Sequence, residues 1–118
     1  MPVATSAAGV EDTTMANFLL TFHGEAGMPT SPDEAAQAMA AWNAWFGALG
    51  DALVDAGNPT SHAKAISPDG SVMDAVSAPT GYSIIRADSL DAAVELSRGC
   101  PVLSAGQAVV VSETFEAM

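Results

Sequence analysis

The stretch from Ser31 to Gly57 limits what this chain can fold into more than any other part of the sequence. Ser31 is a suitable N-cap, Pro32 suits the first helical position, and Glu34 completes an S-x-x-E capping box. Gly57 is a suitable residue to end a helix, and Pro59 prevents its continuation. The sequence therefore predicts one helix over the whole stretch.

Apolar side chains recur along this predicted helix at spacings of three and four residues, the period of one helix face. They are Met39, Trp42, Phe46, Leu49 and Leu53. A helix with one apolar stripe buries that stripe against another element. We therefore expect this helix to be the main cover of a sheet.

The length of 118 residues indicates one domain. Residues 1–16 carry small and polar side chains without periodicity, so we expect a disordered N-terminal tail followed by a folded domain over 17–118. No apolar run approaches the roughly 20 residues that a membrane span needs. The sequence therefore predicts no membrane association.

Charge and composition narrow the classes of partner. The net charge is −11, and only Lys64, Arg86 and Arg98 are positive, so binding to nucleic acid is disfavoured. Because 49% of the residues are hydrophobic and only 14% are charged, we expect part of the surface to be hidden in a homodimer. The single cysteine, Cys100, excludes an internal disulfide and fits a reducing, cytoplasmic compartment.

Several shorter segments have the patterns of strands and of a second helix. Predicted strands cover 17–23, 62–67, 82–87 and 107–115, with 71–74 as an optional short returning strand. A predicted helix covers 90–98 after a cap at Asp88 or Ser89. This order indicates an α+β fold with a four-stranded antiparallel sheet in the ferredoxin-like βαββαβ arrangement. Two helices can cover only one face of such a sheet, so we expect the other face to pack on the sheet of a second copy.

The segment from Gly81 to Leu103, GYSIIRADSLDAAVELSRGCPVL, resembles the YCII-related proteins, the YciI-like group that includes the DGPF proteins. In that family a glycine–aromatic strand runs into an A-D-S-L-D-x-A helix start, and the helix ends at C-P. The strand NFLLTFHG, the W-x-x-W-F-x-x-L-G helix from Trp42 to Gly50 and the strand VVVSETF also fit. The resemblance spans Asn17 to Phe115 and implies a dimeric α+β barrel.

The resemblance also implies a function class, namely a homodimer that binds a small molecule. Some YciI-like proteins are associated with lyase-type chemistry through a His–Asp pair, so the implied reaction is proton abstraction from a small organic acid by a lyase or isomerase. The aspartate of the DGPF motif corresponds to Asp74, although Gly-Pro-Phe does not follow it here. The alternative is a non-enzymatic binding or regulatory dimer.

The candidate site residues lie on the predicted strands and on the long helix. His23 ends the first strand and is the candidate general base, because histidine exchanges protons near neutral pH. Asp74 is its candidate partner, since a carboxylate beside the ring stabilises its charged form. The side chains expected to line the cleft are Trp45, Tyr82, Trp42 and His62.

Metal and cofactor sites are not expected. His23, His62 and Cys100 lack a recognisable ligand spacing, and the sequence has no glycine-rich phosphate loop. Cys100 follows a predicted helix C-terminus, where the helix dipole does not activate a thiol. A nucleophilic role for Cys100 is therefore not expected either.

Overall fold

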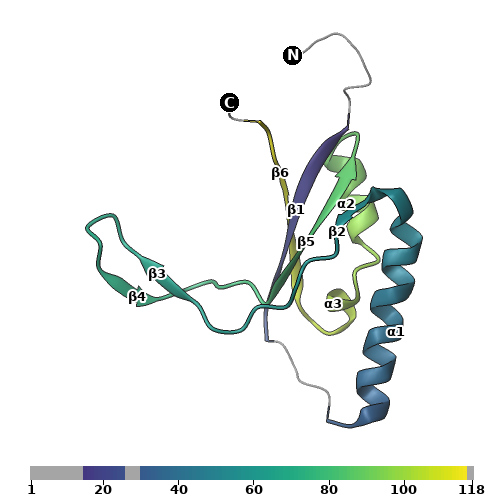
Figure 1. Ribbon diagram of the computed structural model, residues 1–118, viewed down its shortest axis with the longest axis horizontal. Coiled ribbons are helices and arrows are strands. Elements are labelled where there is room, and N and C mark those ends of the chain that lie inside the picture. The colour runs from purple at the N-terminus through teal and green to yellow at the C-terminus, as the bar shows by residue number, and fades with distance from the viewer. Residues whose placement is uncertain (1–14, 26–29, 117–118) are drawn as a thin grey trace.

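The computed structural model describes residues 15–25 and 30–116. These residues form an α+β structure, as predicted (Figure 1). In chain order the elements are β1 (Ala16–His23), α1 (Pro32–Leu49), a 3₁₀ turn (Gly50–Ala52), β2 (Leu53–Asp55), β3 (Lys64–Ile66), β4 (Val72–Asp74), β5 (Gly81–Ala87), α2 (Leu90–Ser97), α3 (Pro101–Ser104) and β6 (Ala108–Glu113).

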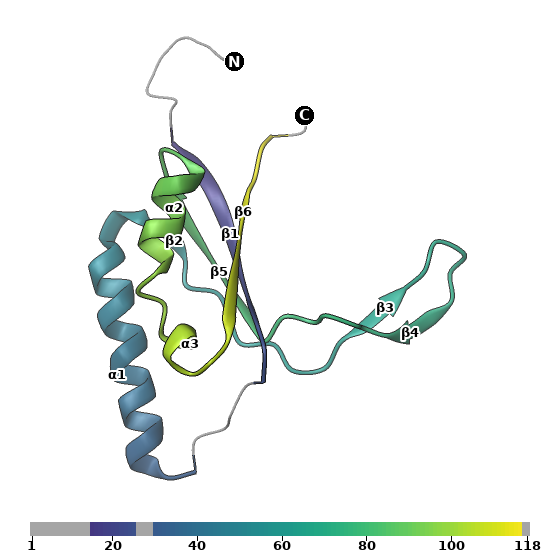
Figure 2. The same ribbon diagram turned by 180° about the vertical axis from the view of Figure 1, so that it is seen from behind.

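Four of these strands make one antiparallel sheet in the order β2-β5-β1-β6, and β3 and β4 make a separate hairpin. Figures 1 and 2 show the helices on one side of the sheet and the hairpin projecting toward the opposite side. The predicted four-stranded antiparallel sheet is therefore confirmed. It is covered by helices on one face only.

The two faces of the sheet differ in burial. Phe18, Leu20 and Phe22 of β1 are buried toward the helices. The side chains that alternate with them lie on the opposite face, because successive residues of a strand point to opposite sides. In register across β1, β5 and β6, the apolar and aromatic side chains of this open face are Leu19, Tyr82, Ile84 and Val110.

The start of α1 is fixed by polar contacts close to those predicted. The Ser31 Oγ accepts a hydrogen bond from the Glu34 N–H (3.1 Å). The Glu34 carboxylate accepts from both the N–H (2.9 Å) and the hydroxyl (2.8 Å) of Thr30, one residue before the cap. These bonds favour the charged form and lower the pKa of Glu34 below its ordinary value of 4.5.

The predicted end of this helix at Gly57 is wrong. The helix stops at Leu49, and Gly50 takes a positive φ of 56° while its N–H donates to the Phe46 carbonyl. The next residues leave the helical path because Leu53 pairs with Ile85 on β5. Glycine adopts this backbone geometry freely, so Gly50 can end the helix. The strand pairing that follows then outweighs the helical spacing of Leu53.

The predicted apolar stripe of α1 is also corrected. Met39 is 61% exposed, and the buried residues of α1 are Trp45 and Leu49. Trp45 donates its indole N–H to the Leu96 carbonyl (3.1 Å), which ties α1 to α2. α1 packs beside α3 and reaches the sheet through long side chains, so the burial of its stripe is uneven.

The second strand of the four-stranded sheet is not the predicted segment 62–67. That position is taken by β2, while β3 and β4 pair only with each other in the described residues. The turn between them is built locally: the Gly70 N–H donates to the Ser67 carbonyl (2.8 Å), and Ser71 donates to the Asp69 carboxylate. A hairpin with its own turn can form without joining the main sheet.

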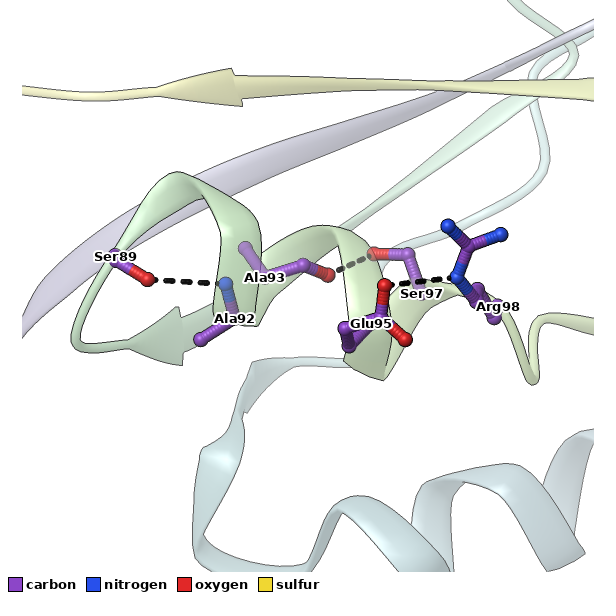
Figure 3. A network of polar contacts seen from close by, with 6 residues as sticks. All are labelled: Ser89, Ala92, Ala93, Glu95, Ser97 and Arg98. Atoms are coloured by element: carbon purple, nitrogen blue, oxygen red, sulfur yellow. Dashed lines mark hydrogen bonds and ion pairs between the residues drawn. The ribbon is translucent and has the colours of Figure 1, made fainter.

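The predicted helix over 90–98 is confirmed as α2 (Leu90–Ser97; Figure 3). Ser89 caps it by accepting from the Ala92 N–H (3.0 Å), and the Ser97 hydroxyl donates to the Ala93 carbonyl (2.7 Å). Its buried side lies against β5, β6 and β1. α3, which follows directly, was predicted only as a connecting segment.

The predicted tail over 1–16 falls largely outside the described residues, and Ala16 belongs to β1. Within the part of the chain that the structure describes, no helix has the length and apolar character needed to cross a membrane.

The backbone of Gly57 lies against the backbone of Tyr82 on β5, and this contact predicts an effect on stability. A Cβ on Gly57 would lie 1.7 Å from the Tyr82 carbonyl oxygen, and φ is 76°. Gly70 has a similar φ of 90°, but no atom lies within 4 Å of its Cβ position. We expect Gly57→Ala to lower the unfolding free energy by about 4 kcal/mol or more, because backbone must move. Gly70→Ala should cost only about 1–2 kcal/mol from the positive φ.

Urea denaturation of both variants measures this difference. Equal losses would mean that the approach of Gly57 to Tyr82 does not contribute to stability.

Candidate functional site

A cavity of about 530 Å³ lies on the helix side of the sheet, between α1 and the start of β5. α1 supplies one wall, and the chain after β2 supplies the rim from Ala56 to Pro59. α3 and the residue Gln107 close the remaining side. Clefts of this size with mostly apolar linings are the usual form of small-molecule sites.

Three aromatic side chains give the cavity one continuous apolar wall. The ring of Trp42 lies 5.6 Å from that of Phe22 and 5.5 Å from that of Phe46, centroid to centroid. Trp42 and Phe46 are half-buried, one helical turn apart on α1, while Phe22 belongs to β1. Tilted ring pairs at this separation attract one another beyond simple burial, so the wall is held in shape.

Hydrogen bonds fix the polar edge of the cavity. The Thr80 Oγ1 lies 2.5 Å from the Gln107 Oε1 and 3.2 Å from the Phe22 carbonyl oxygen. The Tyr82 N–H donates to the Asn58 carbonyl (3.2 Å). The hydroxyl of buried Ser83 donates to the Ala56 carbonyl (2.7 Å), so the rim is bonded to β5 at several points.

The cavity carries no charged group among the described residues. None of its lining residues is Asp, Glu, Lys, Arg or His, and Tyr82 alone has an ionisable side chain. The alternation along β5 directs the Tyr82 side chain to the open face, away from the helices. The cavity therefore offers apolar surface and neutral polar groups.

The structure places His23 away from this cavity lining. His23 ends β1 on the open face and is half-buried, and its Nε2 lies 2.9 Å from the Thr21 hydroxyl oxygen. Asp74 lies on the β3–β4 hairpin, where its carboxylate accepts from the Lys64 ammonium (2.7 Å) and is 89% exposed. No hydrogen bond joins His23 to Asp74 within the described residues. Their pairing stays a prediction.

The other predicted site residues divide between the cavity, the core and the surface. Trp42 lines the cavity, and Tyr82 is also among the lining residues, although the alternation along β5 turns its side chain to the open face. Trp45 is buried in the core, where its ring lies 5.7 Å from that of Trp42, and it is not among the lining residues. His62 is exposed on the segment that leads to the hairpin. Gln107 and Phe46 line the cavity but were not predicted as site residues. The four-residue spacing of Trp42 and Phe46 is a signal in the sequence that the two side chains share one helix face.

Cys100 is a free thiol that is only 2% exposed. Burial raises the pKa of Cys100 above its ordinary value of 9.0, because it disfavours the thiolate. The contribution of Cys100 to the unfolding free energy is therefore fully present below pH 9.0 and is lost as the pH rises past that value. In residues 15–25 and 30–116, no group of three or more His, Cys, Asp and Glu side chains could hold a metal ion.

Comparisons with known proteins give no further assignment. A scan against protein-family models, a search of curated proteins and a search of solved structures each returned no match. The resemblance to YCII-related proteins therefore remains a prediction from the residues of this chain.

The burial of Cys100 predicts low thiol reactivity. A chromogenic disulfide reagent should modify the native protein on the order of a hundredfold more slowly than the urea-unfolded protein, since access requires opening of the fold. The measurement is the rate of thiolate release by absorbance at mildly alkaline pH. Similar rates in both states would contradict a buried, protonated Cys100.

Proposed function

We propose that this protein is a homodimer that binds a small molecule in the cavity beneath α1, without acid–base catalysis. The single observation that carries the proposal is the cavity of about 530 Å³ with its aromatic wall and bonded polar rim. Small-molecule sites are concave, mostly apolar and few per protein. A space of this size within reach of solvent therefore favours a binding role.

The chemistry of the lining favours binding over proton abstraction. A general base must come within hydrogen-bond reach of the proton that it removes. His23 lies on the open face, and Asp74 is engaged by Lys64 on the hairpin. No contact of either residue supports a shared site with the cavity. The lyase or isomerase role expected from the resemblance therefore has no structural support beyond the residue types.

The open face supports the homodimer. Leu19 and Ile84 are opposite each other in register, and Val110 is 48% exposed on the neighbouring strand. The β3–β4 hairpin projects on the same side and exposes Ile66 and Val72 (Figures 1 and 2). Contiguous apolar surface of this kind usually marks an interface. A second copy placed sheet to sheet would cover it.

The finer fold assignment follows the same reasoning. Helices follow β1 and β5, and the strand order β2-β5-β1-β6 supports the ferredoxin-like arrangement with a hairpin inserted between β2 and β5. A sheet with one free face supports the dimeric α+β barrel of the YCII-related proteins. The free thiol of Cys100 supports a reducing location such as the cytoplasm.

The dimer proposal predicts that a charge on the open face separates the subunits. Val110→Asp would bury an unpaired carboxylate between two sheets, which costs several kcal/mol. Sedimentation velocity should show the unaltered chain as a dimer and Val110→Asp as a monomer. Ala40→Asp, on the exposed side of α1, adds the same charge as a control and should stay dimeric. A monomeric unaltered chain would contradict the proposal.

The binding proposal predicts that filling the cavity abolishes ligand binding. Ala38 and Ala40 are both exposed on α1, but only Ala38 is among the lining residues of the cavity. Thermal-shift screening of a metabolite collection should give ligands that stabilise the unaltered chain and Ala40→Trp but not Ala38→Trp. A collection that stabilises none of the three proteins would contradict the proposal.

A further inference from the structure

We infer that the ligand of the cavity is an uncharged molecule built on a flat ring system. This inference rests on the proposed binding function and adds the chemical class of the ligand. It follows from three properties of the cavity: the ring surfaces in its wall, the neutrality of its lining, and the kind of polar group at its edge.

The wall favours a flat, unsaturated ligand. Phe22, Trp42 and Phe46 stand together with neighbouring ring centroids 5.5 to 5.6 Å apart. Aromatic surfaces bind other rings by offset stacking and edge-to-face contact, in addition to the gain from apolar burial. Val102, from α3, adds aliphatic surface to the same cavity.

The lining disfavours an ionised ligand. An ion that leaves water for an apolar site needs a counter-charge or several hydrogen bonds to offset its lost hydration. No charged side chain of the described residues lines the cavity. The net charge of −11 further lowers the local concentration of anions. A carboxylate, sulfonate or phosphate on the ligand would therefore weaken binding.

The polar groups at the edge match neutral partners. They include the amides of Asn43, Asn58 and Gln107 and the hydroxyl of Thr80, with the Gln107 amide oriented by Thr80. Amides and hydroxyls both donate and accept, so they suit a hydroxyl, carbonyl or amide on the ligand. Their number is small beside the apolar surface, and one or two such groups on the ligand would satisfy them.

A matched pair of fluorescent probes tests the inference on the full chain. N-phenylnaphthylamine is neutral, and anilinonaphthalenesulfonate has the same ring skeleton with one sulfonate added. Each is titrated into the unaltered chain, Ala38→Trp and Ala40→Trp, and binding is read from probe emission. Only binding that Ala38→Trp removes and Ala40→Trp retains is assigned to the cavity. If Ala38→Trp fails to fold, Ala105→Phe fills the same cavity from the end of α3.

We expect the neutral probe to bind the cavity at least about tenfold more tightly than the sulfonate, a difference of about 1.4 kcal/mol. Equal or tighter cavity binding of the sulfonate would overturn the neutral class and leave the binding function standing. If neither probe shows cavity binding, both proposals fail, and the space is then assigned to protein packing in the assembled state.

A cationic ligand is the other charged class, and a competition experiment addresses it. Benzyltrimethylammonium places a cation beside an aromatic ring, a contact that Trp42 could accept through its π face. It should displace N-phenylnaphthylamine no better than benzyl alcohol, which is neutral. Displacement about tenfold stronger than that of benzyl alcohol would overturn the neutral class in favour of a cation.

Discussion

The contact between Trp42 on α1 and Phe22 on β1 is the interaction on which the rest of the candidate site depends. It joins the long helix to the sheet at a ring separation of 5.6 Å. Trp45, three residues later on α1, donates a hydrogen bond to the Leu96 carbonyl of α2. Large aromatic side chains bridge a helix and a sheet at a greater separation than small ones allow. The space beside them is the cavity, so its presence follows from the choice of tryptophan at this contact.

The sheet divides the molecule into two different surfaces. The helix side contains the core and the cavity, whereas the open face carries His23 and a set of apolar side chains that the described chain does not cover. The proposed ligand binding uses the first surface and the proposed dimerisation uses the second, so the two roles do not compete for the same face of the sheet. It also separates histidine from the cavity, which is why binding is the better-supported proposal.

Local signals accounted for the parts of the fold that depend on neighbouring residues. The cap at Ser31 and the alternation of β1 and β5 were predicted because hydrogen bonds to nearby backbone and strand periodicity are properties of short segments. The end of α1 was predicted wrongly because Leu53 fits either a helix face or a strand. Pairing of Leu53 with Ile85, more than thirty positions later, decided for the strand.

The candidate site shows the same division. By itself the sequence determined an acidic α+β chain with a four-stranded antiparallel sheet and one long capped helix. Only the tertiary structure decided which side chains share a cavity. Thr80 directly precedes β5 and Gln107 directly precedes β6, and the fold brings these two residues into contact. It also decided that Asp74 pairs with Lys64, because the register of the hairpin sets these two residues directly opposite each other.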